Sequence, residues 1–153
     1  MSDSEAPSRP PLLVGNAIFW TSRHAAGHPL AIPRVSLAID LCRVLGWLPA
    51  ERYRESAPAS VAELARFHAA DYIEAVLACE RASHATAEQS RVYNLGVNGN
   101  PVHGDVFRRP AAACGGSLLA ARLLASGGVI HHPADGTHHG LKARASGYCV
   151  FND

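Results

Sequence analysis

The chain has 153 residues, a length that suits one domain. Apolar residues make up 48% of it and charged residues 18%, a composition that excludes disorder along the whole chain. The formal net charge is +1, and lysine and arginine are scattered singly. The sequence therefore predicts neither a nucleic-acid-binding surface nor an acidic interaction tail.

The four cysteines, Cys42, Cys79, Cys114 and Cys149, lie far apart and form no Cys-x-x-Cys pair. This spacing argues against a zinc ribbon and a disulfide scaffold, and it predicts buried free thiols in a reducing compartment. No apolar run reaches the roughly 18 residues of a membrane span. Residues 1–11 are polar and proline-rich, unlike a signal peptide. We expect a cytoplasmic protein with no membrane partner, whose residues 1–11 are disordered.

The first part of the chain predicts a strand followed by helices. Residues 12–20 form a short apolar run that suits a buried strand, and residues 37–45 carry apolar side chains at helical spacing. Ser60 and Glu63 form a capping-box pattern, the signature of a helix N-terminus. A second amphipathic helix is expected from about residue 71 to residue 82.

The second part of the chain predicts a loop followed by an αβ pattern. Residues 85–109 are polar and rich in glycine and asparagine, which indicates a long surface loop. Two glycines at 115–116 open an alanine- and leucine-rich helix over residues 117–125, and short apolar runs at 129–131 and 148–151 are candidate strands. A helix closed by glycines and followed by a short β-branched run is typical of a parallel sheet, so the predicted class is α/β.

The chain ends at Cys149-Val150-Phe151-Asn152-Asp153, inside an apolar run and without a polar tail. Natural domains seldom end within an element. We therefore expect residues 12–153 to be the N-terminal part of a domain that is truncated after Asp153.

The densest group of reactive side chains lies at residues 131–140, where four of the nine histidines fall. Histidine, with a pKa of about 6.5, both takes and gives a proton near neutral pH. His138 and His139 are adjacent on a loop flanked by Gly136 and Gly140, so both side chains can face one cavity. Adjacent residues rarely bind the same metal ion. Spacing alone leaves metal ligation, acid–base catalysis and a structural or exposed loop as open interpretations.

The order, spacing and types of further residues resemble the histone deacetylase superfamily. The resemblance is carried by Gly136-Thr137-His138-His139-Gly140, Ser146-Gly147-Tyr148-Cys149 and Asn152-Asp153, with support from His28-Pro29, Arg34, Phe67-His68, Asp71-Tyr72-Ile73, Tyr93-Asn94-Leu95-Gly96 and Gly115-Gly116-Ser117. It covers roughly residues 12–153 and is nearest to bacterial acetoin-utilisation-type and acetylpolyamine-type members. It implies an arginase/deacetylase-type fold, a single parallel sheet with helices on both faces, of which this chain would hold the first half.

The resemblance implies a zinc-dependent hydrolase of N-acetyl or other N-acyl amides, such as acetyl-lysine or acetylated polyamines. His139 would be the general base, and His138 would orient or tune the site. The expected partner is an acetylated protein lysine or a small acylated amine, with no nucleic acid. The alternative is an inactive fragment, or a binding or regulatory module that retains the substrate tunnel without metal.

The resemblance also implies a path for the substrate. The residues that match the wall of the family's narrow tunnel are Gly147, Tyr148 and Cys149. Arg34 matches the family arginine at an inner exit cavity, where its charge can hold or release acetate.

Three departures from the family pattern limit these expectations. Gly99 stands where the family has an aspartate that clamps the substrate backbone, which favours small acylated amines over histone-like peptides. Asp135 stands where the family usually has glycine, and nothing in the sequence explains this difference. The family takes its metal ligands from positions after the Asn-Asp pair, so no ligand is expected within this chain. Ligands for zinc, or for iron in its place, would follow Asp153.

Overall fold

The computed structural model of the chain describes residues 9–153. The disorder expected for residues 1–11 falls mainly on residues 1–8, which lie outside the described residues. A parallel sheet runs through the described part in the order β2-β1-β3. Its strands are β1 (Leu12–Gly15), β2 (Tyr53–Glu55) and β3 (Ile130–His131). The predicted single parallel sheet is therefore confirmed.

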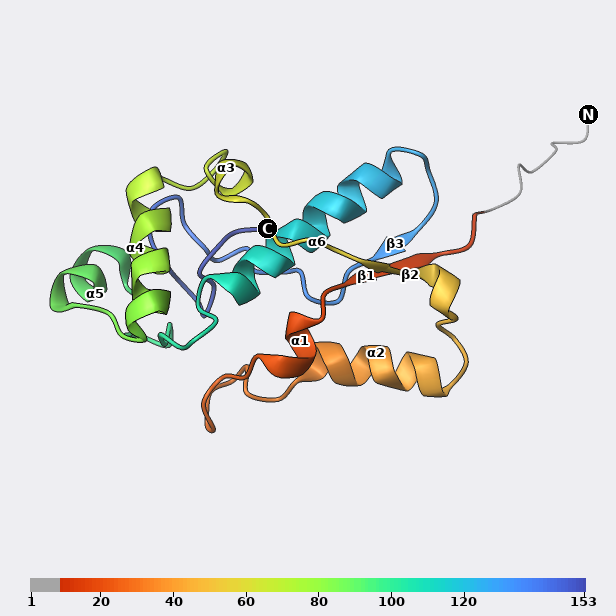
Figure 1. Ribbon diagram of the computed structural model, residues 1–153, viewed down its shortest axis with the longest axis horizontal. Helices are drawn as coiled ribbons and strands as arrows, with labels where there is room; N and C mark the ends of the chain where they lie inside the picture. The colour runs from red at the N-terminus through yellow and green to blue at the C-terminus, as the bar shows by residue number, and fades with distance from the viewer. Residues whose placement is uncertain (1–8) are drawn as a thin grey trace, which may run out of the picture.

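All helices of the described residues lie between β1 and β3 along the chain. They are α1 (Ile18–Thr21), α2 (Arg34–Val44), the short 3-10 helix η1 (Ala50–Arg52), α3 (Val61–Leu64), α4 (Ala70–Ala82), α5 (Ala87–Tyr93) and α6 (Arg108–Leu124). Helix α6 contacts both β1 and β3. Figure 1 shows α6 above the strands and α2 below them, which agrees with the predicted placement of helices on both faces of the sheet. No helix within residues 9–153 is long and apolar enough to cross a bilayer.

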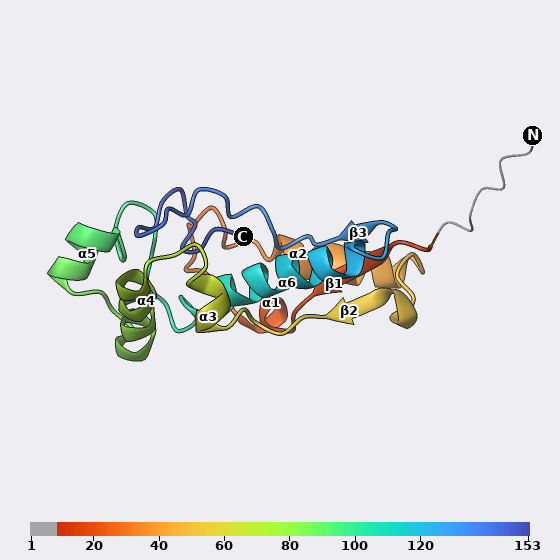
Figure 2. The same ribbon diagram turned by 90° about the horizontal axis from the view of Figure 1, so that it is seen from above.

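Helices α3, α4 and α5 gather at the end of the molecule away from the strands, and both views agree on this arrangement (Figures 1 and 2). The last residues of the chain return to the same end and pack inside it. Phe151 and Tyr72 of α4 are fully buried in one apolar cluster, and the Tyr72 hydroxyl donates a 2.7 Å hydrogen bond to the carbonyl oxygen of Val150. Burying a side chain of this size stabilises a fold by about 2–3 kcal/mol. The C-terminal segment is thus part of the core.

A smaller apolar cluster links α1 to α6. Its buried members are Phe19, Ala112 and Ala113, and Val35 of α2 packs against them. This cluster fixes the start of α2 near the first turns of α6, which is where the cavity described below is found.

Several predictions about single elements are confirmed. The helix expected at residues 37–45 is α2, the helix expected at 71–82 is α4, and the strand expected at 129–131 is β3. The capping box is present at α3: Ser60 Oγ accepts from the Glu63 N–H, and the Glu63 carboxylate accepts from the Ser60 N–H.

Other element predictions were wrong for local reasons. Residues 85–109 are not all loop, because Thr86 and Gln89 form a second capping box that starts α5. Helix α6 begins at Arg108, seven residues before the two glycines that were expected to open it. The apolar run at 148–151 forms a turn rather than a strand, since Tyr148 has a φ of 68°. Only β1 of the expected 12–20 strand is extended, and α1 follows it.

Gly115 lies inside α6 where that helix meets the chain before α3. A Cβ atom added there would collide with the carbonyl oxygen of Ala57 and would lie 2.7 Å from the backbone nitrogen of Ala59. Both obstacles are backbone atoms that cannot rotate away.

We expect Gly115→Ala to lower the free energy of unfolding by about 1–3 kcal/mol, because overpacking forces the backbone to shift. Alanine is favoured over glycine in a helix interior by about 1 kcal/mol, so propensity alone predicts the opposite sign. Urea unfolding followed by circular dichroism measures the difference. Gly104→Ala is the matched control, because nothing lies within 4 Å of a Cβ added at Gly104. Equal stability of the two variants would contradict the close approach.

Candidate active site

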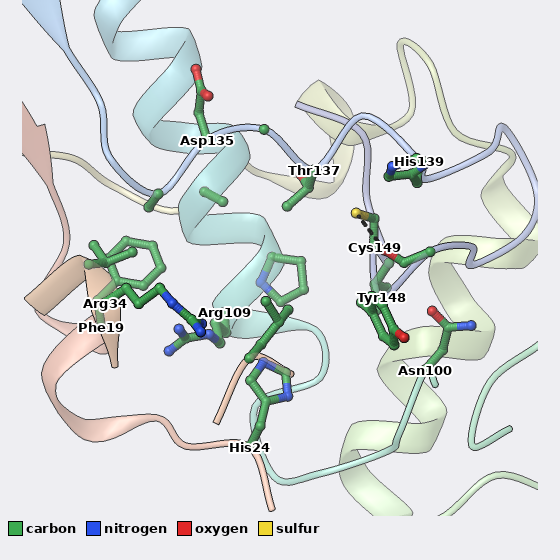
Figure 3. A pocket seen from close by; sticks show the side chains of 18 of the residues that line it. Phe19, His24, Arg34, Asn100, Arg109, Asp135, Thr137, His139, Tyr148 and Cys149 are labelled. Atoms are coloured by element: carbon green, nitrogen blue, oxygen red, sulfur yellow. Dashed lines mark hydrogen bonds between the residues drawn. The ribbon is translucent and has the colours of Figure 1, made fainter. Parts of the chain in front are cut away.

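The residues that the family resemblance singled out all line one cavity of about 410 Å³. They are Arg34, His138, His139, Gly147, Tyr148 and Cys149. Figure 3 shows His139, Cys149 and Tyr148 along one side of this cavity, Arg34 and Phe19 along the opposite side, and Thr137 between them. The volume lies in the range of small-molecule sites.

His138 and His139 lie side by side on the loop that follows β3. Their ring centroids are 4.5 Å apart with an interplanar angle of 41°, and both side chains are exposed where they line the cavity. A Cβ atom added at Gly147 would lie 2.7 Å from Cγ of His139, so the Gly147 backbone packs directly against that ring. Gly147 has a φ of 54°, which L-residues with side chains rarely adopt. Any side chain at position 147 would displace the His139 imidazole.

The loop that carries the two histidines is held by the last two residues of the chain. The Asn152 side-chain amide donates to the carbonyl oxygens of His138, at 3.0 Å, and Gly140, at 2.9 Å. The Asp153 carboxylate accepts a 2.8 Å bond from the Thr137 N–H. These contacts begin before the histidine pair and end after it, so they fix the backbone that presents both rings.

His68, which sequence reasoning left out of the site, supports this arrangement from behind. Its Nε2 accepts a 3.0 Å bond from the Asn152 N–H, so Nδ1 carries the proton and donates to the carbonyl oxygen of Leu141 at 3.1 Å. His68 is buried among the rings of Phe67, Tyr72 and Phe151. Burial lowers the pKa of His68, which keeps this ring neutral in the state that the two hydrogen bonds require.

The Tyr148 ring lies against Gly99 at the rim of the cavity. A Cβ atom added at Gly99 would approach Tyr148 Cε1 to 2.5 Å, and the ring of His28 packs edge-on against Tyr148 with centroids 5.3 Å apart. His28 Nε2 also hydrogen-bonds the Gly99 carbonyl oxygen at 3.1 Å. The aromatic ring of Tyr148 therefore occupies the space that a side chain at position 99 would need.

Cys149 is buried beside the histidine pair, and its thiol donates a weak hydrogen bond to the carbonyl oxygen of Gly147 at 3.4 Å. Burial raises the pKa of the Cys149 thiol, so this group is a wall of the cavity and not a nucleophile at neutral pH. All four cysteines are free thiols, as predicted; three are buried and Cys42 is half-buried.

The cavity wall also contains cationic and neutral polar side chains that sequence reasoning did not assign to the site. They are His24, His103 and Arg109, which lie beside Arg34 and Phe19 in the cavity wall. Burial lowers the pKa of His24 to about 4, with His103 and Arg109 adding to the effect, and burial also lowers the pKa of His103. Both imidazoles are therefore neutral at pH 7. No pattern of spacing links residues 24, 103 and 109, and only the fold brings them together.

His131 and His132 do not line the cavity. His132 is buried between two carbonyl oxygens, with Nδ1 3.2 Å from Val14 O and Nε2 3.0 Å from Ala113 O. It connects β1 to α6 and has a structural role, whereas His131 is exposed at the end of β3.

Within residues 9–153, no three His, Cys, Asp or Glu side chains lie close enough together to hold a metal ion. The described residues therefore do not form a zinc site on their own, and the chemistry that follows concerns proton transfer and binding by the residues present.

The family model of the histone deacetylase domain matches residues 28–153, and the chain belongs to this family. Among its relatives is the acetoin utilization protein AcuC of Bacillus subtilis (strain 168), which is 34% identical over 128 residues that cover 82% of this chain and 33% of that protein. The AcuC protein of Staphylococcus aureus (strain MSSA476) is 32% identical over 130 residues, with the same coverage. The chain thus spans about a third of the length of the curated relatives it matches.

Solved structures support the same assignment of fold. The crystal structure of a histone deacetylase homolog from Aquifex aeolicus superimposes with a TM-score of 0.90 at 33% identity and covers 94% of this chain and 39% of that one. A crystal structure of a histone deacetylase homolog in complex with SAHA matches with the same values. The arginase/deacetylase-type fold expected from the sequence is confirmed.

The pKa shifts of the buried histidines predict how stability depends on pH. Unfolded histidines take up protons near their ordinary pKa of 6.5, whereas folded His24, His68 and His103 have lowered pKa values and resist protonation. The unfolded state therefore binds more protons below pH 6.5, and stability falls as the pH falls from there toward 4. Thermal unfolding between pH 7.5 and about 4.5 measures this. His24→Gln should flatten the profile relative to His84→Gln, and a melting temperature that rises on acidification would refute the prediction.

The Asn152 amide provides a separate test of how the histidine loop is held. Asn152→Asp replaces two hydrogen-bond donors by an acceptor that faces two carbonyl oxygens, and we expect a loss of about 1–3 kcal/mol in the free energy of unfolding. Hydrogen exchange at residues 137–141 should accelerate more than elsewhere. Gln89→Glu is the control, because the Gln89 side-chain oxygen accepts from the Thr86 N–H and a carboxylate keeps that bond. Unchanged exchange in the Asn152 variant would show that other contacts fix the loop.

Proposed function

We propose that this chain contributes the proton-transferring and substrate-binding part of a hydrolase that cleaves N-acetyl or other N-acyl amides, such as acetyl-lysine or acetylated polyamines. The observation that carries the proposal is the adjacent pair of imidazoles, with ring centroids 4.5 Å apart, in the wall of a cavity that Gly147, Tyr148 and Cys149 also line. The chain's membership of the histone deacetylase family supports amide hydrolysis as the class of reaction.

His139 is the proposed general base. It takes a proton from the water that attacks the acyl carbon, and it returns a proton to the amine nitrogen as the carbon–nitrogen bond breaks. The Gly147 backbone packs against the His139 ring and restricts its rotation. Such restriction favours proton transfer because the nitrogen stays within reach of the water.

His138 is the proposed positioning partner. Its backbone carbonyl accepts from the Asn152 amide, so its place beside His139 is set by the same hydrogen bonds that hold the loop. With ring centroids 4.5 Å apart, the His138 ring limits the positions that the His139 imidazole can take.

The proposed substrate path runs from Tyr148 at the rim to Arg34 at the far end. Tyr148 is 46% exposed and offers an aromatic face to the alkyl chain of an acylated amine. The Tyr148 ring fills the space that a side chain at position 99 would need, so no side chain there can bind a peptide backbone. This supports small acylated amines, rather than peptides, as substrates. Arg34 supplies positive charge where a carboxylate product would leave.

We propose that the metal ion, zinc or iron in its place, is held by ligands outside residues 9–153. When bound, such an ion polarises the acyl carbonyl. The free thiols in the core support a reducing compartment, and we propose the cytoplasm.

The general-base role is tested by His139→Ala in the protein as its gene encodes it. Turnover of an acetyl-lysine reporter should fall by about 100-fold or more, because general acid–base catalysis contributes on that scale. Metal content, measured by mass spectrometry, should stay unchanged.

His84→Ala is the matched control, since His84 is exposed and does not line the cavity. Undiminished turnover in the His139 variant would remove the base assignment. Tight binding of an acetylated amine with no turnover in the unaltered protein would favour a binding or regulatory module instead.

A further inference from the structure

The cavity has an excess of positive charge at the end away from the histidine pair. Arg34 and Arg109 both line it, and Asp135 is the one carboxylate among the described lining residues. Figure 3 shows Arg34 and Arg109 at the same end of the cavity, whereas the Asp135 side chain points away from both. Within residues 9–153, neither arginine has a carboxylate within ion-pair distance.

Arg109 is surrounded by groups that do not neutralise it. Its Nη1 donates a 3.1 Å bond to the carbonyl oxygen of Ser22, and its guanidinium lies over the Phe19 ring at 5.2 Å. Arg23 donates to the same Ser22 oxygen at 3.2 Å, so two guanidinium groups converge on one carbonyl. Burial lowers the pKa of Arg109, and the charge of Arg23 lowers it further. Such a cluster is unfavourable unless an anion joins it.

The one carboxylate that raises the pKa of Arg109 already forms an ion pair with another arginine. Asp105 raises the pKa of Arg109, but its Oδ1 lies 2.8 Å from Nη2 of Arg108 in an ion pair. Arg109 also lies in the first turn of α6, where the helix dipole disfavours a cation. The contacts with Ser22 and Phe19 position the Arg109 guanidinium, but neither an ion pair nor the helix dipole balances its charge.

We propose that Arg109, with Arg34, binds a carboxylate that the substrate carries on its acyl group, and that this site prefers short dicarboxylic acyl groups of the malonyl and succinyl class to acetyl. The inference rests on the proposed amide hydrolysis and names its acyl substrate. A guanidinium is suited to this task because its planar N–H groups bind both oxygens of a carboxylate. The neutral His24 and His103 rings beside Arg109 add hydrogen-bonding capacity without competing charge.

The reaction balances with water alone. The water oxygen bonds to the acyl carbon as the carbon–nitrogen bond breaks, and both water protons end on the amine nitrogen. The products are a dicarboxylate and an alkylammonium ion. No atom changes oxidation state, so neither an oxidant nor a reductant is needed.

The test compares acetyl, malonyl and succinyl forms of one fluorogenic lysine reporter, using the protein as its gene encodes it. We expect kcat/KM for the better dicarboxylic acyl group to exceed that for acetyl by about tenfold or more. In Arg109→Gln this ratio should fall by about tenfold, and in Arg109→Lys by less, because the charge remains. Arg81→Gln, an exposed arginine on α4 outside the cavity, should leave the ratio unchanged.

Equilibrium binding separates this inference from the proposed function. Titration calorimetry should show succinate binding about tenfold more tightly than acetate, with the difference lost in Arg109→Gln. Hydrolysis of acetyl-lysine with equal binding of the two anions would overturn the dicarboxylic preference and leave the proposed function standing. Absence of all hydrolysis would contradict the proposed function, and the succinate titration would still decide whether Arg109 binds a carboxylate. Circular dichroism confirms that each variant is folded.

Discussion

The hydrogen bonds between the end of the chain and the histidine loop are the constraint on which the site depends. A loop outside regular structure must find partners for its N–H and C=O groups, or lose stability for each one that is buried without a partner. Here the Asn152 amide satisfies two loop carbonyls and the Asp153 carboxylate accepts one loop N–H. The spacing between the His-His pair and the Asn-Asp pair is therefore a structural requirement, since the second pair holds the backbone of the first.

This constraint extends into the core through His68. The ring joins Asn152 to Leu141 and is enclosed by aromatic side chains of the cluster around Tyr72 and Phe151. The histidine pair is consequently anchored to α4 and its neighbours, and the sheet contributes only the strand from which the loop departs. A buried neutral imidazole suits this position, because one nitrogen must donate while the other accepts.

Sequence reasoning succeeded where the conformation of a segment follows from its neighbours along the chain. The Ser60–Glu63 capping box and the periodicity of α4 are local patterns, and each lies where it was expected. It failed where tertiary contacts decide. Residues 148–151 have a strand-like composition, yet Tyr148 takes a left-handed turn so that Phe151 can enter the core.

The cavity shows the same limit more clearly. Arg34 was found only through its place in a family pattern, and His24, His103 and Arg109 were not found at all, because they reach the cavity from three separate segments. Charge scattered singly along a sequence gives no sign of convergence in space. The net charge of +1 therefore says nothing about the local concentration of guanidinium groups at one end of the site.

The cationic character of the cavity comes from arginine and not from histidine. Burial holds the imidazoles of His24 and His103 neutral, with the positive charge of Arg109 adding to the effect, whereas arginine keeps its proton at any physiological pH. In the proposed reaction, Arg34 and Arg109 therefore keep their charge on the acyl group or its carboxylate product at every stage, while His139 takes and returns a proton. Binding and proton transfer fall to different residues of one cavity, so a change in one does not require a change in the other.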